Sequence, residues 1–155
     1  MASFEAFVRE RGDDLLRLAY VLSGQRTDAQ DVVQEALTRA LERWDRVSRA
    51  DDPYAYLRRM VVNANISRWR STLRREVPHP EIADARTIGD HADAHALWQA
   101  CLSLPSDQSI AVILRYYEGL PYAEIAELVG CAEATARSRV ARALSELRTE
   151  LEREV

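Results

Sequence analysis

The chain has 155 residues, of which 47% are hydrophobic and 30% charged, enough to build cores in one ordinary domain or two small ones. It contains no run of about 18 apolar residues, so no transmembrane helix is expected. The N-terminal residues lack the basic and apolar segments of an export signal, and the 2 cysteines do not form a disulfide framework. These features predict a protein of the reducing cytoplasm with no membrane association.

Alanine, leucine, arginine and glutamate dominate the composition, while glycine and proline number only 5 each, which favours helix over strand. The net charge of -4 would by itself argue against a nucleic-acid partner. The charge is unevenly distributed, however: residues 1–75 carry +3, residues 76–109 carry -5 and residues 110–155 carry -2. All 21 basic residues are arginine, whose planar guanidinium can make paired hydrogen bonds to phosphate or guanine.

Apolar residues recur at helical spacing from Phe4 to Leu22, which predicts a helix that Gly12 interrupts and Gly24 ends. The letters TDAQ at 27–30 match a capping box with a threonine cap and predict the start of a second helix. Its buried stripe would comprise Val33, Ala36, Leu37, Ala40, Leu41 and Trp44. Its opposite face carries the polar residues Asp31, Gln34, Glu35, Thr38, Arg39 and Glu42.

A polar loop is expected at Ser48–Asp52, followed by another helix. Asp52 is a good N-cap residue, and Pro53 suits the first helical position. The helix carries the apolar residues Tyr54, Leu57, Val61 and Ile66. It ends in a basic cluster made of Arg68, Arg70, Arg74 and Arg75.

Residues 76–95 predict a linker, because they combine prolines and scattered acids with no sustained apolar stripe. Helical periodicity returns at 91–104. Three further helices are expected. The first is capped by Ser106 and stopped by Gly119, and the second runs from Pro121 to Gly130. The third starts near Glu133, with the inner stripe Ala136, Val140, Leu144, Leu147 and Leu151.

No strand pattern occurs anywhere in the sequence. We therefore expect an all-α fold with two small helical domains, at 1–75 and 96–155, joined by the linker at 76–95.

Residues 122–147 have the spacing of a helix-turn-helix, with a three-residue turn at 130–132. Opposite its apolar stripe, the second helix carries Arg137, Ser138, Ala141, Arg142 and Ser145, with Arg139 on the flank. Small residues beside arginines suit a DNA major groove, since the small side chains permit close approach and the guanidinium groups reach guanine edges or phosphates. The same pattern also fits the solvated face of an ordinary antiparallel helix pair.

Four segments resemble extracytoplasmic-function (ECF) sigma factors, the small promoter-recognition subunits of bacterial RNA polymerase. Residues 114–131, LRYYEGLPYAEIAELVGC, and 135–144, TARSRVARAL, resemble region four, except that Ala136 stands where the family usually has valine. Residues 28–36, DAQDVVQEA, resemble the polymerase-binding helix of region two. Residues 52–70, DPYAYLRRMVVNANISRWR, resemble its promoter-melting segment, in the branch bearing V-N-x-x-I-S-x-W-R that is common in actinobacteria.

The resemblance implies roles for particular residues. The C-terminal helix would recognise the minus-thirty-five promoter element. Asn63 and the loop Ser48–Asp52 would hold a flipped base of the minus-ten element. Trp69 would wedge between bases or stack on one, although an aromatic residue near a helix end is more often part of a core. Phosphates of the melted strand would be gripped by Arg58, Arg59, Arg68 and Arg70. Docking on the polymerase would fall to Asp31, Gln34, Glu35 and Arg39.

The implied partners are promoter DNA and core RNA polymerase, contacted at the clamp helices of its largest subunit and at its flap. An anti-sigma factor is a further expected partner, because members of the family are often held by one. The alternative hypothesis is a freestanding helix-turn-helix regulator that binds duplex DNA without polymerase.

No catalytic motif is evident, so neither enzymatic activity nor a cofactor is expected. His91 and His95 stand four residues apart beside Asp90 and Asp93, a spacing that can bind a metal. Because the sequence places no third ligand, a polar helix start is the favoured interpretation and no metal site is predicted. Cys101 and Cys131 adjoin apolar runs and are expected to be buried.

Overall fold

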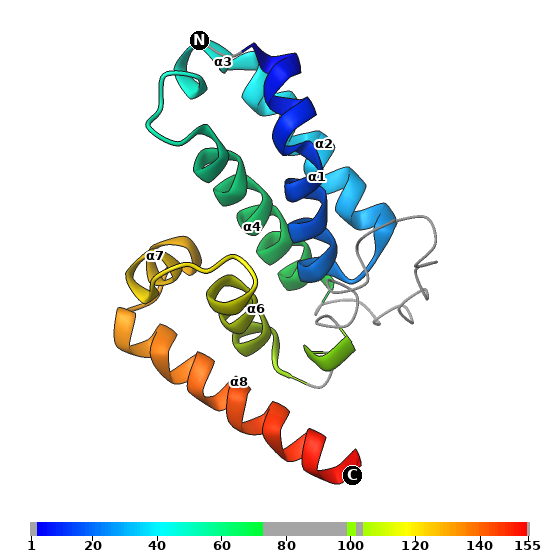
Figure 1. The fold of residues 1–155 in the computed structure, drawn as a ribbon, viewed down its shortest axis with the longest axis vertical. Helices are drawn as coiled ribbons and strands as arrows, with labels where there is room; N and C mark the ends of the chain where they lie inside the picture. The colour runs from blue at the N-terminus through cyan, green and yellow to red at the C-terminus, as the bar shows by residue number, and fades with distance from the viewer. Residues whose placement is uncertain (1–2, 73–98, 102–103, 155) are drawn as a thin grey trace. The chain divides into compact units, whose positions relative to one another are not determined.

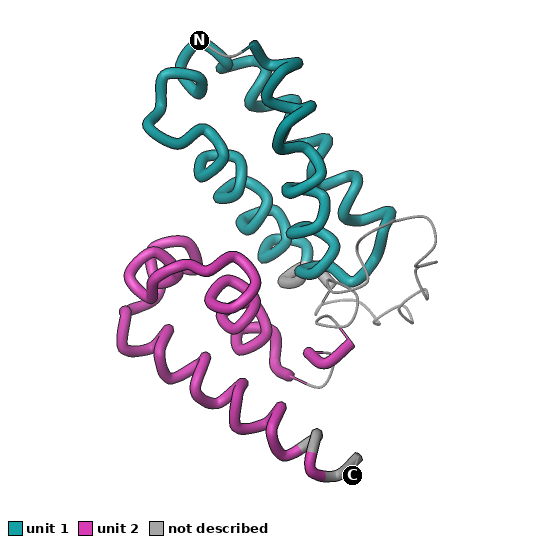
Figure 2. Tube along the Cα trace, viewed as in Figure 1, with its two compact units in different colours: residues 1–94 teal, residues 95–155 magenta. Residues whose placement is uncertain are grey.

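All regular structure in the described residues is helical, which confirms the predicted all-α architecture (Figure 1). The computed structural model of the chain describes residues 3–72, 99–101 and 104–154. The chain divides into two compact units, here called unit 1 (residues 1–94) and unit 2 (residues 95–155) (Figure 2). No helix among the described residues is long and apolar enough to span a membrane.

The described helices of unit 1 are α1 (Phe4–Ser23), α2 (Arg26–Glu42), α3 (Trp44–Val47) and α4 (Pro53–Thr72). Helices α1, α2 and α4 pack against one another, and α3 adjoins α2. The fully buried side chains that form this core include Leu15, Leu18, Val32, Leu57 and Val61. Removing one leucine or valine side chain from water stabilises a fold by about 1.5–3 kcal/mol.

Helix α1 continues through Gly12, so the predicted interruption was wrong. A glycine inside a helix costs about 0.5–1 kcal/mol relative to alanine. Burial of Phe7 and Leu15 on either side offsets that cost. Gly24 ends the helix as predicted, with φ of 74° and its N–H donating to the Tyr20 carbonyl at 2.7 Å.

The capping box predicted at Thr27 does not form. Helix α2 begins at Arg26, and its N-cap residue Gln25 makes no side-chain capping bond. The Ser23 hydroxyl instead accepts from the Gln25 N–H at 3.3 Å and donates to the Gln25 carbonyl at 3.1 Å. Together with the left-handed Gly24, this turn directs the chain into the helix before Thr27 is reached.

Helix α2 ends at Glu42, two residues before Trp44, the last residue of the predicted stripe. Trp44 starts α3 instead, with its ring centroid 5.5 Å from that of Phe4 and 5.5 Å from that of Phe7. Because the Trp44 indole packs on α1, Trp44 is not part of the buried stripe of α2. Leu41, also predicted in that stripe, is 53% exposed.

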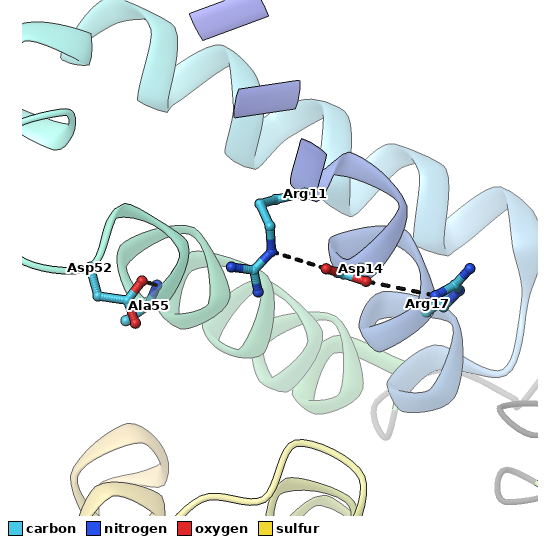
Figure 3. Close-up of polar contacts among 5 residues, drawn as sticks. All are labelled: Arg11, Asp14, Arg17, Asp52 and Ala55. Atoms are coloured by element: carbon cyan, nitrogen blue, oxygen red, sulfur yellow. Dashed lines mark hydrogen bonds and ion pairs between the residues drawn. The ribbon is translucent and has the colours of Figure 1, made fainter. Parts of the chain in front are cut away.

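Asp52 and Pro53 start α4 as predicted. The Asp52 carboxylate accepts from the Ala55 backbone N–H at 3.3 Å (Figure 3). Tyr54, the second residue of the helix, is buried. The start of α4 is therefore fixed both by a cap and by burial of its first aromatic side chain.

In unit 2 the helices α6 (Ser106–Tyr116), α7 (Tyr122–Val129) and α8 (Glu133–Glu154) pack against one another. Residues 99–101 are also helical, and most of the rest of the helix expected at 91–104 lies outside the described residues. The unit 2 core includes Ile113, Leu114, Ile125, Ala136 and Val140.

The ends of these helices match the sequence in part. Gly130 stops α7 as predicted, with φ of 76°, whereas α6 already ends at Tyr116, three residues before Gly119, whose φ is 71°. Ser106 is not a cap, because Pro105 takes the N-cap position and makes no side-chain bond there. Leu144 was predicted to face inward but is 36% exposed. The buried residues among those described in α8 all lie in its first half, before Leu144.

Candidate nucleic-acid interface

The turn between α7 and α8 is fixed by backbone hydrogen bonds. The carbonyl of Ala126 accepts from the N–H groups of Gly130 at 2.9 Å and Cys131 at 3.0 Å. The φ of 76° at Gly130 is left-handed, a conformation that glycine adopts without steric cost. Ile125 of α7 and Ala136 of α8 are both fully buried, which locks the second helix against the first.

Helix α8 presents the arginine-bearing face that the sequence predicted. Ala136, Val140 and Ala143 are buried and form its inner stripe. The side chains on the other face are exposed at Arg137, Ser138, Ala141, Arg142 and Ser145. Two guanidinium groups separated by small side chains therefore stand on one accessible helix face, as major-groove recognition requires.

Arg137 is held in place by its neighbours. Its Nη2 lies 2.7 Å from Oε1 of Glu133, one helical turn earlier. Its guanidinium carbon lies 4.9 Å from the centroid of the Tyr122 ring at the start of α7. Arg115 of α6 stacks on the same ring at 4.3 Å and donates to the Leu120 carbonyl at 3.0 Å. The ion pair with Glu133 and the contact with the Tyr122 ring thus restrict the orientations of the Arg137 side chain.

Arg139 takes a different position. Its side chain is 26% exposed, and its Nε lies 3.6 Å from Oδ2 of Asp107 on α6. The pair ties the flank of α8 to α6. The structure therefore separates Arg139 from the exposed face that carries Arg137 and Arg142.

Helix α4 presents a second polar face. Arg59, Asn63 and Ser67 follow one another at four-residue spacing, and all three are exposed. Asn65, by contrast, is buried and donates from its amide nitrogen to the Val61 carbonyl at 2.9 Å. Of the two asparagines in the VNAN segment, only Asn63 is accessible to a base. The side chains of Trp69 and Arg70 lie outside those that the structure describes.

Arg58 does not fit the predicted role of gripping a phosphate. Only 8% of this residue is exposed, and its guanidinium carbon lies 5.7 Å from the centroid of the buried Tyr54 ring. Its position follows from helix geometry, since Arg58 is adjacent to the fully buried Leu57 and one turn before Val61 and Val62. The structure thus buries Arg58 beside Tyr54 of the same helix.

Arg68 lies at the far end of the same helix and is half-buried. Its Nη1 donates to Oδ1 of Asp28 on α2 at 3.3 Å, a contact that links residues 40 positions apart. Arg68 therefore has a carboxylate partner within unit 1, with which a DNA phosphate would compete.

The loop between α3 and α4 is polar and outward-facing. Its residues from Arg49 to Asp52 are exposed, while Ser48 is half-buried. The backbone is nonetheless held, because Ser48 N–H donates to the Trp44 carbonyl at 2.8 Å and Ala50 N–H to the Val47 carbonyl at 3.1 Å. An accessible loop of fixed backbone is suited to contact a base.

Helix α2 carries the four residues predicted to dock on polymerase, and all four are exposed: Asp31, Gln34, Glu35 and Arg39. Nη2 of Arg39 lies 3.0 Å from Oε1 of Glu35. Leu41 lies seven residues after Gln34, so this exposed leucine borders the same face. An acidic surface with an apolar residue at its edge is suited to a protein partner.

The two cysteines are both free thiols and differ in environment. Cys101 is buried as predicted, and desolvation raises the pKa of its thiol to about 11. Cys131, in the helix-turn-helix turn, is only half-buried. The described residues contain no cluster of metal-ligating side chains, and the histidine pair at 91 and 95 lies outside them.

The sequence-based prediction missed the residues that contact Arg68, Arg137 and Arg139. Glu133 could have been found, since Glu and Arg four residues apart in a helix commonly pair. Tyr122, Asp107 and Asp28 could not, because each meets its arginine only through the packing of two helices.

Unit 2 carries an arginine-bearing helix after a tight turn, and unit 1 carries an exposed face of arginine and asparagine, as expected of a protein that binds nucleic acid. Comparison with known families agrees. Residues 7–75 match sigma-70 region 2, and residues 94–147 match sigma-70, region 4. The chain belongs to the sigma-70 family of RNA polymerase sigma factors, in its ECF group.

The relatives extend along nearly the whole chain. The RNA polymerase sigma-E factor of Streptomyces avermitilis is 38% identical over 152 residues, which cover 96% of this chain and 85% of that protein. The RNA polymerase sigma factor SigV of Bacillus subtilis is 29% identical, with coverage of 95% and 90%.

Two solved structures share the fold. The sigma factor RpoE of Bartonella quintana, solved in complex with the anti-sigma factor NepR, has a TM-score of 0.69 and 28% identity, and the match covers 94% of this chain and 96% of that one. The ECF sigma factor SigJ of Mycobacterium tuberculosis has a TM-score of 0.66 and 30% identity, with coverage of 90% and 51%.

Proposed function

We propose that this sigma factor directs promoter-specific transcription by presenting three surfaces: α2 to the polymerase, α4 with its preceding loop to the minus-ten element, and α8 to the minus-thirty-five element. The observation that carries the proposal is the coincidence of these exposed faces with the segments of a sigma-70 family chain. The protein would act by binding, with the chemistry of RNA synthesis belonging to the polymerase. Its place of action would then be the cytoplasm.

Recognition of the minus-thirty-five element would rest on Arg137 and Arg142. Both are exposed on one face of α8, and the small Ser138 and Ala141 between them allow the helix to approach base edges. Arg139, paired with Asp107, would serve the flank and contact a phosphate at most.

Recognition of the minus-ten element would rest on Asn63, whose amide offers a donor and an acceptor to an unstacked base. Arg59, one turn before it, would hold a phosphate of the melted strand, and the loop Ser48–Asp52 would line the base. Three further residues extend this proposed surface toward the end of α4: Arg68, Trp69 and Arg70. Arg58 is left out of the contact set because it is buried.

Docking on core polymerase would use Asp31, Gln34, Glu35 and Arg39 against the clamp helices of the largest subunit, with Leu41 as an apolar contact at the edge. Carboxylates on an exposed helix face favour a basic partner helix. Unit 2 would meet the flap of the polymerase.

The boundaries proposed for the two domains are 1–75 and 96–155, with 76–95 as the linker. Two weak contacts joined by a linker and by a shared polymerase bind promoter DNA as one bivalent unit. An anti-sigma factor that covers both DNA surfaces would switch this unit off. The relative from Bartonella quintana was solved in complex with the anti-sigma factor NepR.

The test is run-off transcription with bacterial core RNA polymerase that lacks any sigma factor, on a library of upstream regions from the organism that encodes this chain. Transcripts that start at shared minus-thirty-five and minus-ten sequences and depend on the protein would support the proposal. Tight binding to a palindromic duplex without polymerase, together with no transcripts, would favour a freestanding regulator instead.

A further inference from the structure

The loop Ser48–Asp52 is bounded on both sides by contacts to one face of α1. Before the loop, the ring of Trp44 packs against Phe4 and Phe7, each at a centroid distance of 5.5 Å. After the loop, the guanidinium carbon of Arg11 lies 3.7 Å above the centroid of the Tyr54 ring. The α1 residues involved, Phe4, Phe7 and Arg11, stand three and four positions apart and so share one helix face.

The second contact is held on the arginine side as well. Nε of Arg11 lies 2.9 Å from Oδ2 of Asp14, whose other oxygen lies 3.7 Å from Nη1 of Arg17 (Figure 3). Figure 3 shows Arg11 extending from α1 toward the first turn of α4, where Asp52 caps the helix. Stacking on a buried ring requires the planar guanidinium, which a lysine ammonium cannot supply.

Tyr54 is the residue through which this contact acts on the loop. It is 5% exposed and lies two residues after Asp52, the last residue of the loop. On its other side the buried Arg58 lies 5.7 Å from the ring centroid. Displacement of the ring would therefore move the first turn of α4 and the loop end that Asp52 forms.

We propose that Arg11 is a positioning residue for promoter opening: by stacking on Tyr54 it fixes the downstream end of the Ser48–Asp52 loop, while Trp44 fixes the upstream end. The base-contacting loop is then preorganised in the free protein, so that capture of a flipped base does not first require ordering of the loop. This inference rests on the proposed function of the loop. It adds a role for α1, to which the proposed function assigns no contact with the base or the polymerase.

The first experiment needs neither polymerase nor DNA. Backbone hydrogen exchange of the full chain is compared for the unsubstituted protein, Arg11→Gln and the matched control Arg9→Gln, which removes the same charge from an exposed position of α1. Arg11→Gln should speed exchange at Ala55 and Tyr56, whose N–H groups are bonded to Asp52 at the downstream end of the loop, by about 3- to 30-fold. Exchange at Ala36, in the core of α2, should stay unchanged in both variants. Equal acceleration at Ala36, or no change at Ala55 and Tyr56, would overturn the proposal.

The second experiment measures opening itself, with core polymerase and a promoter obtained from the run-off assay. Permanganate reactivity of unpaired thymines should fall about 3- to 30-fold with Arg11→Gln and Arg11→Lys, and should be retained with Arg9→Gln. Tyr54→Phe should retain opening because it keeps the ring, whereas Tyr54→Leu should lose it. Full opening by both Arg11 variants would overturn the proposal.

The two failures are distinguishable. If the unsubstituted protein opens no promoter with core polymerase, the proposed function fails. The hydrogen-exchange result would still decide whether Arg11 positions the loop.

Discussion

The carboxylate of Glu133 lies 2.7 Å from the guanidinium of Arg137, one turn later on the proposed recognition helix. The arginine also stacks at 4.9 Å on Tyr122, which belongs to the preceding helix. An arginine with one nitrogen engaged still has free N–H donors. In the proposed complex with DNA, Glu133 would therefore set the direction from which Arg137 approaches a base, and its negative charge would repel phosphates.

Glu133→Gln should strengthen non-specific DNA binding, because it removes a carboxylate from the DNA-facing end of α8. We expect the slope of log K against log salt concentration to become steeper by about 1 for the polymerase complex. The measurement is a salt titration on random-sequence and promoter duplexes. Glu152→Gln, an exposed change near the end of α8, is the charge-matched control and should leave the slope unaltered.

Arg142→Ala should weaken promoter recognition by about 1–3 kcal/mol if the side chain makes a paired contact with a base, and the loss should concentrate at one position of the minus-thirty-five element. Competition binding of the polymerase complex to single-base promoter variants checks this. Arg148→Ala, exposed six residues later on α8, serves as the control. A uniform loss on every sequence would assign Arg142 to a phosphate instead.

Asn63→Ala should reduce strand opening more than it reduces closed-complex binding, since the amide is proposed to contact only an unstacked base. Permanganate reactivity reports the open complex, and duplex binding at low temperature reports the closed one. Asn65→Ala is no suitable comparison, because the buried Asn65 amide bonds to the Val61 carbonyl and its loss would disturb the helix. Ser67→Ala, on the same exposed face, is the better control. Equal losses in both assays would remove Asn63 from the base contact.

Glu35→Arg should weaken association with core polymerase by charge reversal on the exposed face of α2. Reversal also breaks the Glu35–Arg39 pair, but an exposed pair within a helix contributes only about 0.3–0.5 kcal/mol, so the fold should persist. Core binding measured by fluorescence anisotropy is the test. Glu10→Arg, an exposed reversal on α1, is the control. Undiminished core binding by Glu35→Arg would place the docking face elsewhere.

Cys101 should react slowly with thiol reagents at pH 8, and Cys131 faster, because burial raises the pKa of the Cys101 thiol to about 11. The same shift has a consequence for stability. Below pH 9 the thiol is protonated in both the folded and unfolded chain, so the free energy of unfolding does not depend on it. Between about pH 9 and 11 only the unfolded chain loses the proton, so stability should fall, and denaturant titrations of Cys101→Ser against the unsubstituted protein check this.

Sequence periodicity was a sound guide to helices and exposed faces. The stripe Ala136–Val140 predicted which side of α8 packs inward, and Arg137 and Arg142 are accordingly exposed. Capping motifs were a less reliable guide where two candidate helix starts lay close together in the sequence. Thr27 and Gln30 matched a capping box, but the Ser23–Gly24 turn starts the helix earlier.

What the sequence could not predict are contacts between helices. Arg58 and Arg59 are adjacent and chemically identical, yet one is buried beside Tyr54 and the other is exposed, because successive residues of a helix point about 100° apart. The pairing of Arg68 with Asp28 and of Arg11 with Tyr54 likewise depends on how α1, α2 and α4 pack.

Several arginines of the proposed DNA surfaces already have an acidic neighbour in the free chain: Arg68 has Asp28, Arg137 has Glu133 and Arg139 has Asp107. Together with a net charge of -4, this internal neutralisation lowers the attraction of the lone subunit to bulk chromosomal DNA. Chromosomal DNA offers a large excess of non-specific binding sites for exposed cations. A subunit bound at such sites would encounter polymerase slowly. If these surfaces bind DNA as proposed, the ion pairs would favour an order of assembly in which polymerase is bound first and DNA second.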